Sequence, residues 1–310
     1  MTAHITVVGS LNMDLVARTP RIPQPGETII GSDFRTVPGG KGANQAVAVA
    51  RLGPQVSMVG RVGRDAFAQP LLDNLAAVGV DHTFVLQDPG AATGVALIVV
   101  DDAGENSIVV ASGANARLSP ADVDAAESAI AAADGLLLQL ESPLETVSRA
   151  AEIARAHEVT VILNPAPARP LPAELLAMVD VLIPNESETA LLTGLPVGDQ
   201  AQTRAAATAL LDLGVGTVIL TLGERGAMLA QEGRTELVPA FTVTPVDTTA
   251  AGDAFVGGLV VALAEGRALS EAVRWGNATG ALATTKLGAQ PSLPTRQELE
   301  ALLSTGSKGV

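Results

Sequence analysis

The chain has 310 residues, 47% of them hydrophobic, which is enough for one large domain or two smaller ones with an ample core. Its formal net charge of −14 argues against a nucleic-acid partner, and the lack of cysteine excludes disulfides and thiolate metal sites. The N-terminus has no basic region followed by a long apolar one, and no apolar run reaches about 18 residues, so we expect a cytoplasmic protein without a membrane span.

Short apolar runs alternate along the chain with longer segments of helical periodicity. The expected strands are Ile5–Val8, Val56–Val59, Leu136–Leu140, Val159–Leu163, Val179–Ile183, Val218–Thr221 and Leu237–Val246. The expected helices are Gly42–Leu52, Ala66–Val78, Ala121–Ala132, Leu144–Ala156, Glu186–Leu192, Ala205–Leu213 and Ala254–Glu265. This alternation predicts an α/β fold, with a doubly wound, mostly parallel sheet that carries helices on both faces.

Two stretches interrupt the alternation. Residues 14–37 combine extended segments with several prolines, and residues 94–110 have the pattern of a hairpin that turns at Asp101–Gly104. We expect both to form a small β-sheet lid. The rest of the chain (1–13, 38–93 and 111–310) would then form the α/β core that binds the nucleotide and the substrate.

Polar side chains follow two of the expected strands directly. Asn12 and Asp14 come after the first strand, and Glu141 comes after Leu136–Leu140. Ligands of open α/β sheets bind beyond the carboxyl ends of the strands, and carboxylates and amides there suit a polyhydroxylated ligand such as a sugar. Taken singly, each residue is more often an ordinary turn residue.

A glycine-rich loop, Pro38–Gln45, precedes the first expected helix. It is not a P-loop, because Arg35 stands where a glycine is needed and Gly42 follows Lys41 in place of serine or threonine. Its glycines would bring the backbone close to a ligand, and Lys41 and Asn44 would present donors to it. The alternative is a simple glycine-rich loop with a surface lysine.

Two weaker motifs follow later strands. Asn185 and Glu188 lie three residues apart on one helix face, a spacing that suits either water-mediated Mg²⁺ binding or a capping box. The segment Thr221–Gly226 places two glycines at a strand end, as a nucleotide loop would, although such a pair alone is weak support.

The segment Asp247–Asp253 is the most informative in the chain. Its small residues form a turn that opens a helix, where backbone N–H groups and the helix dipole favour a phosphate. The carboxylate of Asp253 would repel a resting phosphate, but it suits a base that takes a proton from an attacking hydroxyl. The alternative is that Asp247 is a turn residue and Asp253 an ordinary first-turn acid.

Together these motifs resemble the ribokinase (PfkB) family of carbohydrate kinases over about Val7 to Ser292. The family's two signatures match Gly39–Asn44 and Asp247–Asp253. Further stretches that match in the same order are residues 9–14, 25–28, 93–98, 139–144, 164–168 and 288–292.

The resemblance implies ATP-dependent phosphorylation of D-ribose at O5, with Asp253 as the base and Ala250, Ala251 and Gly252 as the anion hole. Ribose would be held by Asn12, Met13, Asp14, Gly40, Lys41, Gly42, Ala43, Asn44, Glu141 and Asp253. ATP would be bound by Asn185, Thr221, Leu222, Gly223, Glu224, Arg225, Gly226, Gly252, Asp253 and Asn277. The alternatives are a kinase of 2-deoxyribose, fructose or adenosine, and a sugar-binding regulator without catalysis.

A Mg²⁺ ion is expected near Glu188, through water, and the resemblance also implies a monovalent cation such as K⁺ and a homodimer. The residues that match the cation site are Asp247, Thr249, Ala283, Lys286, Gly288 and Ser292. The two extended segments match a lid that pairs with a second subunit. No nucleic acid or membrane partner is expected.

Overall fold

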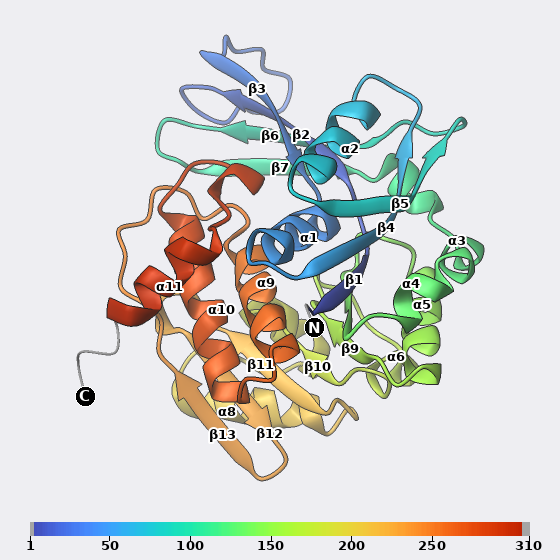
Figure 1. The fold of residues 1–310 in the computed structure, drawn as a ribbon. Helices are drawn as coiled ribbons and strands as arrows, with labels where there is room; N and C mark the ends of the chain where they lie inside the picture. The colour runs from blue at the N-terminus through green and yellow to red at the C-terminus, as the bar shows by residue number, and fades with distance from the viewer. Residues whose placement is uncertain (1–2, 306–310) are drawn as a thin grey trace.

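The computed structural model describes residues 3–305, and most of them build one mixed β-sheet with helices packed on it (Figure 1). Within those residues the sheet has nine strands. The central strands are nearly continuous apolar runs, such as Gly135–Leu138, because both faces of the sheet are covered. In order across the sheet the strands are β13 Arg234–Val238, β12 Ala227–Gln231, β11 Thr217–Thr221, β10 Val181–Leu182, β9 Thr160–Leu163, β8 Gly135–Leu138, β1 His4–Val8, β4 Gln55–Gly63 and β5 Val80–Asp88.

Seven neighbouring strands, from β11 to β5, run parallel, and β12 is antiparallel to both of its neighbours. The chain leaves β1 toward β4 and β5, and it then returns to β8 on the other side of β1. The strand order therefore reverses between β1 and β8. Open α/β sheets bind ligands at such a reversal, beyond the carboxyl ends of the strands.

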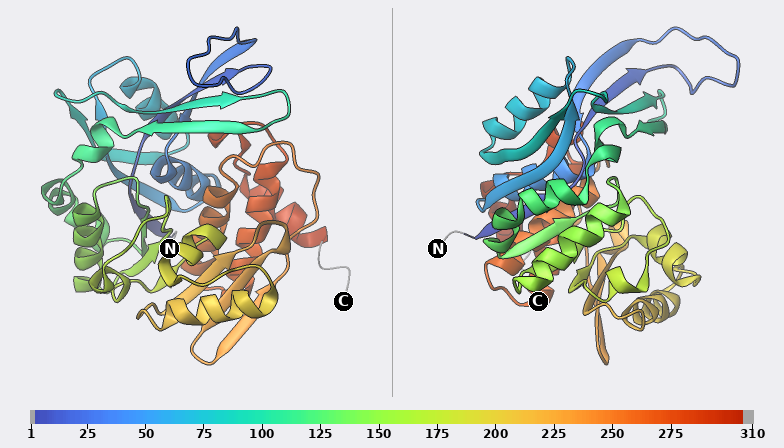
Figure 2. Two further views of the ribbon diagram at one scale, coloured as in Figure 1. Left: turned by 180° about the vertical axis from the view of Figure 1, so that it is seen from behind. Right: turned by 90° about the vertical axis from the view of Figure 1, so that its right-hand side faces the viewer.

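Helices cover both faces of the sheet, as the sequence predicted, and each face has its own apolar core (Figures 1 and 2). One face packs against α1 Lys41–Arg51, α2 Ala68–Ala77, α9 Ala251–Ala264, α10 Leu269–Thr284 and α11 Arg296–Thr305. The other packs against α3 Pro120–Ala125, α4 Glu127–Ala131, α5 Leu144–Ala156, α6 Ala173–Leu176, α7 Glu186–Thr193 and α8 Gln200–Leu211. Short 3₁₀ turns are η1 Gly113–Arg117, η2 Gly223–Arg225 and η3 Gln290–Ser292.

A second, four-stranded sheet projects from the body at the top of Figure 1. Its order is β3 Asp33–Gly39, β2 Asn12–Arg18, β6 Gly94–Val100 and β7 Asn106–Ala111. The hairpin of β6 and β7 turns at residues 101–105, where the sequence predicted a turn. Strand β2 begins at Asn12, so the second sheet starts directly after the end of β1.

Several expected elements differ from the structure. The expected strand Leu237–Val246 is wrong beyond Val238, because β13 ends there and the following prolines have no N–H to donate to a ladder. The expected helix Ala121–Ala132 is divided into α3 and α4 at Ala126. Helix α8 begins at Gln200 rather than Ala205, because Asp199 forms a capping box with Gln202.

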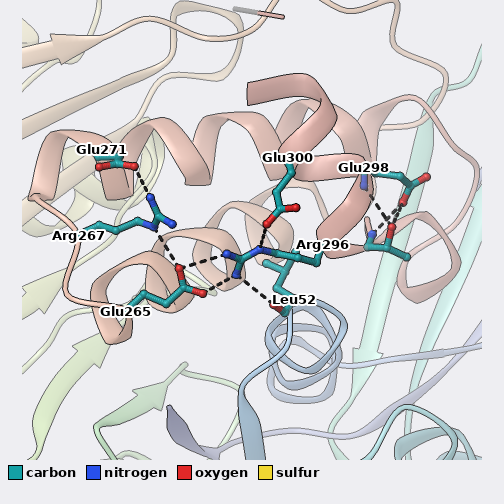
Figure 3. A network of polar contacts seen from close by, with 8 residues as sticks. Leu52, Glu265, Arg267, Glu271, Arg296, Glu298 and Glu300 are labelled. Atoms are coloured by element: carbon teal, nitrogen blue, oxygen red, sulfur yellow. Dashed lines mark hydrogen bonds and ion pairs between the residues drawn. The ribbon is translucent and has the colours of Figure 1, made fainter. Parts of the chain in front are cut away.

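The last described helix, α11, is fastened to the body through Arg296 (Figure 3). Its guanidinium pairs with Glu265 and with Glu300, donates to the carbonyl of Leu52 at 3.4 Å, and lies 4.5 Å from the ring centroid of Trp275. Leu52 follows α1, and Glu265 follows α9, so one side chain joins three helices. Among residues 3–305 no helix is long and apolar enough to cross a membrane.

Candidate active site

A cavity of about 690 Å³ opens where β1 and β8 end, beneath the second sheet. The second sheet contributes apolar residues of β6 and β7, such as Ile98 and Ile108. Seven of the residues predicted to hold a sugar line this cavity: Asn12, Asp14, Gly40, Lys41, Asn44, Glu141 and Asp253.

Asp14 presents an unpaired carboxyl to the cavity. The residue is only 8% exposed, and no donor among the described residues hydrogen-bonds to its carboxyl oxygens. Burial raises the pKa of Asp14 to about 7, and the nearby charges of Glu141 and Asp253 add to the rise. A buried acceptor without a partner is costly, so the site favours a ligand that donates hydrogen bonds to Asp14.

Glu141 is held at the start of helix α1. Its Oε2 accepts from the hydroxyl of Ser10 at 2.5 Å and from the backbone N–H of Lys41 at 3.1 Å. Gly40, the N-cap residue, has no side chain to do this and has φ of 89°. A Cβ on Gly40 would lie 2.7 Å from the backbone nitrogen of Asn12, so only glycine lets the loop approach β2 this closely. Glu141 therefore caps α1 from another part of the chain.

Asn12 is oriented by a buried neighbour. Its Oδ1 accepts from Nδ2 of Asn115 at 2.7 Å, and Asn115 is itself fixed by the backbone N–H and carbonyl of Leu11. This arrangement turns the amide nitrogen of Asn12, a donor, away from Asn115. The cavity is thus lined by one donating amide and two carboxyl groups at adjoining strand ends.

The turn before α9 has the geometry of an anion site. Ala250 adopts a left-handed conformation with φ of 58°, which is uncommon for a residue other than glycine. Ala251 donates its N–H to the carbonyl of Thr248 at 3.2 Å, but among the described residues no acceptor meets the N–H of Gly252 or Asp253. A Cβ added to Gly252 would meet nothing within 4 Å. Two backbone donors at this helix N-terminus are thus without a partner among the described residues, and there is open space beside Gly252.

The carboxyl of Asp253 lies in the first turn of α9 and is 6% exposed. Its Oδ2 accepts from Asn44 at 2.9 Å, and its Oδ1 accepts from Gln45 at 3.0 Å. Burial raises the pKa of Asp253, while the charge of Lys41 and the two amide donors act in the opposite direction. A carboxylate that is held by two hydrogen bonds beside an anion site can act as a proton acceptor.

Lys41 lies among acidic groups without a short ion pair to any of them in the described part of the chain. Burial alone would lower the pKa of Lys41. The carboxylates of Asp253, Glu141 and Glu188 outweigh burial and raise it, so the amine stays charged. Its ammonium group is thus available to an anionic ligand.

A second cavity, of about 820 Å³, lies on the other side of the turn. Thr221, Gly223, Glu224, Arg225, Gly226 and Asn277 line it, as expected of a nucleotide site, together with Ala251 and Gly252. Asn277 is buried and donates to the carbonyls of Val238 and Pro239. Thr248 lines both cavities, so the turn of residues 248–253 separates them and faces each.

Several residues of the predicted sites line neither cavity. Met13, Ala43 and Leu222 belong to the apolar cores, and Gly42 packs against the backbone of Gly9 and Ser10. Asn185 and Glu188 form the capping box of α7, with both side chains bonded to each other's backbone N–H. Burial raises the pKa of Glu188. Within residues 3–305 no three His, Cys, Asp or Glu side chains are grouped to hold a metal ion.

Of the residues expected around a monovalent cation, Asp247, Thr249 and Gly288 are joined directly, at the opposite end of the turn. Oδ1 of Asp247 accepts from the N–H and the hydroxyl of Thr249, and Oδ2 accepts from the N–H of Gly288 at 2.8 Å. Burial disfavours the charged form of Asp247, but these hydrogen bonds outweigh it and lower its pKa. Ser292 donates to the carbonyl of Ala289, Ala283 is buried in α10, and Lys286 pairs with Glu298.

Sequence reasoning missed the residues that orient the others. Ser10 holds Glu141, Asn115 holds Asn12, and Gln45 holds Asp253. Gln45 stands within the glycine-rich loop, so its position offered a signal. Asn115 offered none, because it lies in a 3₁₀ turn 103 positions from its partner.

Three comparisons bear on the chain. Residues 2–296 match the model of the pfkB family carbohydrate kinase. A ribokinase of Haemophilus influenzae is 45% identical over 96% of this chain and 97% of its own, and a deoxyribokinase of Salmonella typhi is 40% identical over 97% and 98%. The structure of Arabidopsis thaliana ribokinase complexed with ribose and ATP is similar with a TM-score of 0.90 at 34% identity, covering 98% of this chain and 99% of that one.

Proposed function

The chain belongs to the pfkB family of carbohydrate kinases, and we propose that it transfers the terminal phosphoryl group of ATP to O5 of D-ribose. ATP-dependent phosphorylation of ribose is the activity to which its relatives and its site point together. The products are D-ribose 5-phosphate and ADP, and a cytoplasmic location suits a reaction that consumes ATP.

One observation carries the proposal: the turn of residues 248–253 stands between the two cavities and serves both. Asp253 and Ala250 face the sugar cavity, whereas Ala251 and Gly252 face the nucleotide cavity. A phosphoryl group that moves from one cavity to the other must pass the free N–H groups of this turn. Such preorganised donors stabilise charge in the transition state without reorganising.

In the transfer step Asp253 accepts the proton of the attacking sugar hydroxyl. The new bond forms between that oxygen and phosphorus, the bond to the bridging oxygen of ADP breaks, and ADP leaves with the electron pair. The N–H groups of Gly252 and Asp253 meet the charge on the transferring oxygens. Lys41, charged and unpaired, adds a positive charge beside the same path.

Asp14, Asn12 and Glu141 suit the ring hydroxyls of ribose. The charged form of Asp14 accepts from two neighbouring hydroxyls, and Asn12 donates. Oδ1 of Asn44 is buried without a partner, although its Nδ2 is bonded to Asp253. A sugar hydroxyl that satisfied Asn44 Oδ1 would therefore lie next to the base, as O5 must.

Two cations fit the proposal differently. Mg²⁺ supplies charge neutralisation of the ATP phosphates. Among the described residues no three His, Cys, Asp or Glu side chains are grouped to hold it, so its protein contact here would be through waters ordered by Glu188. K⁺ would be held by carbonyl oxygens around Asp247, Thr249, Ala283, Lys286, Gly288 and Ser292, and the charge of Asp247 and its position between two loops support this site.

The second sheet acts in this proposal as a lid over ribose and as the contact with a second subunit, the roles expected of residues 14–37 and 94–110. Ile98 and Ile108, which pair across β6 and β7, line the sugar cavity. Leu97 and Val109 pair on the opposite face and are 48% and 61% exposed. Apolar side chains exposed on a small sheet favour a partner surface. Sedimentation of the wild type and of Val109→Asp would test the dimer, which the variant should weaken.

A substrate panel tests the proposed function. Release of ADP would be measured with ribose, 2-deoxyribose, fructose and adenosine, and ribose should give the highest kcat/KM. The Salmonella typhi relative makes 2-deoxyribose the second candidate. A preference for 2-deoxyribose would reassign the substrate, and ATP hydrolysis that no sugar increases would contradict a sugar kinase.

A further inference from the structure

Three linked amides, of which Gln45 and Gln139 are buried and Asn164 is half-buried, stand behind the carboxyl of Asp253, and none of them lines either cavity. Gln45 is 0% exposed, and its Nε2 donates both to Oδ1 of Asp253 at 3.0 Å and to Oδ1 of Asn164 at 3.1 Å. Its Oε1 accepts from Nε2 of Gln139 at 2.6 Å. Asn164 in turn donates its Nδ2 to the carbonyl of Ile183 at 2.8 Å.

One backbone carbonyl determines how the amide groups of Asn164 and Gln45 are oriented. The carbonyl of Ile183 can only accept, so Asn164 must turn its nitrogen toward Ile183 and its oxygen toward Gln45. Gln45 must then present its nitrogen to that oxygen, and the same nitrogen reaches Asp253. The donor side of Gln45 is thereby fixed toward the base. Gln139 reinforces this by donating to the other end of the amide.

The two amides that hold Asp253 differ in exposure to the ligand. Asn44 lines the sugar cavity, so it can exchange its hydrogen bond when a sugar enters. Gln45 is shielded from both cavities, so its bond to Oδ1 persists. Oδ1 of Asp253 is thus held by a residue outside both cavities, and Oδ2 is held by a residue that lines the sugar cavity.

We propose that Gln45, oriented by Gln139 and Asn164, is a positioning residue that favours the ionised form of Asp253 and aims it at the sugar hydroxyl; this rests on the proposed function. Burial and neighbouring carboxylates favour the protonated form of Asp253, which could not take a proton. Two amide donors and one lysine oppose them. The charged groups that face Asp253 are Lys41 of α1, Asp14 of β2, Glu141 after β8 and Glu188 of α7.

The test is the pH profile of kcat with ribose in Gln45→Met, which keeps the size of the side chain but removes the donor. A hydrogen bond to a charged group changes an equilibrium by about 10- to 100-fold, so the acidic limb should move up by about one to two pH units. KM for ribose and for ATP should change little. Gln139→Met removes only the hydrogen bond that orients Gln45, so the acidic limb of the pH profile should move in the same direction by a smaller amount.

Thr6→Val is the matched control. Thr6 is also 0% exposed, and the variant removes the hydrogen bond from its hydroxyl to the carbonyl of Ala129, away from the site. It should lower the melting temperature and leave the acidic limb unmoved. If Gln45→Met behaves like Thr6→Val, with lower stability and an unchanged limb, Gln45 is only structural and the proposal is wrong.

A second readout does not need turnover. The ¹³C signal of the Asp253 carboxyl, identified by its loss in Asp253→Asn, can be titrated in the protein alone. Its pKa should be higher in Gln45→Met and Gln139→Met than in the wild type. If the Asp253 carboxyl had the same pKa in these variants and in the wild type, the proposal for Gln45 would be overturned, whatever the substrate. If the wild type were inactive on every sugar, only the proposed function would be contradicted.

Discussion

Asn44 and Asp253 are 209 positions apart in the chain, and Nδ2 of Asn44 donates to Oδ2 of Asp253 at 2.9 Å. Each lies in the first turn of its own helix, α1 or α9. The two helices pack closely through Ala48 and Gly257, where a Cβ on the glycine would lie 2.5 Å from that of Ala48. Small residues at this contact therefore bring the glycine-rich loop and the anion-site turn together into one site.

Replacement of the base should remove turnover and leave binding in place. In Asp253→Asn the shape of the side chain is kept, but it cannot take a proton. General-base catalysis contributes about 10²–10⁴-fold, so kcat should fall by at least about 100-fold while ribose and ATP still bind by calorimetry. A variant that kept a tenth of the wild-type kcat would rule out Asp253 as the base.

Asp14 should matter for the sugar and not for the nucleotide. Asp14→Ala removes an acceptor that a sugar hydroxyl would otherwise meet, and a hydrogen bond to a charged group is worth about 1.5–3 kcal/mol. The KM for ribose should rise by about 10- to 100-fold, with little change for ATP. Equal changes in both KM values would instead indicate that Asp14 supports the second sheet.

The pKa of Asp14 also links sugar affinity and stability to pH. The pKa of Asp14 is about 7 in the folded protein, against an ordinary value of 3.8. Between these two pH values Asp14 is therefore protonated in the folded protein and ionised in the unfolded chain. Asp14 therefore costs stability above about pH 7, and this cost disappears as the pH falls toward 3.8. Asp14→Asn should be more stable than the wild type above pH 7, and the difference should shrink in acid.

Ribose affinity should change with pH in the opposite direction to stability, because the charged form of Asp14 is the better acceptor. Calorimetric affinity for ribose without ATP should weaken as the pH falls below about 7 in the wild type. In Asp14→Asn the affinity should be lower and independent of pH over the same range. A wild-type affinity that stayed constant across pH 7 would contradict the role given to Asp14.

Potassium should act on the transfer step through Asp247. An ion held between Thr249 and Gly288 would order the turn whose N–H groups meet the phosphoryl charge. Potassium should raise kcat at saturating ribose and ATP, sodium and lithium should do so less, and Asp247→Ala should lose most of the effect. Identical rates in potassium and tetramethylammonium would mean that Asp247 joins the loops by its own hydrogen bonds alone.

Arg296 should contribute to stability without affecting catalysis (Figure 3). Arg296→Ala loses two ion pairs, a bond to the carbonyl of Leu52 and the contact with Trp275. Because the side chain is partly exposed, we expect a loss of about 1–2 kcal/mol in the free energy of unfolding, with kcat unchanged. Urea denaturation can be followed by the fluorescence of Trp275, the chain's single tryptophan. Arg204→Ala, on an exposed face of α8, should stay within about 0.5 kcal/mol of the wild type.

The parallel core could be predicted because its local signals agree. Ile5–Val8 and Leu144–Ala156 combine clear periodicity with clear ends, and both were confirmed nearly residue for residue. The apolar composition of Leu237–Val246 gave a wrong prediction, because most of this segment has no neighbouring strand to pair with. That segment is rich in β-branched residues, yet its prolines and the lack of a neighbouring strand beyond β13 leave most of it irregular.

The candidate site divides in the same way. Residues such as Asp14 and Asp253 could be named because they sit at strand ends or helix starts, where polar groups face a ligand. The residues that hold Asp253 in place could not be named in this way. Gln139 and Asn164 follow different strands, and they meet Gln45 only because of the order of the strands in the sheet. Contacts across about 100 positions depend on topology, which local patterns do not encode.

The most direct test of the central claim is the identity of the product. Wild-type protein would be incubated with ATP and [5-¹³C]ribose, and the product examined by ¹³C and ³¹P NMR, with Asp253→Asn in parallel. We expect one phosphomonoester whose phosphorus couples to C5, formed together with an equal amount of ADP, and at least about 100-fold less product from the variant in the same time. A phosphate on another carbon, or ADP formed without any sugar phosphate, would contradict a base at Asp253 that directs transfer to O5.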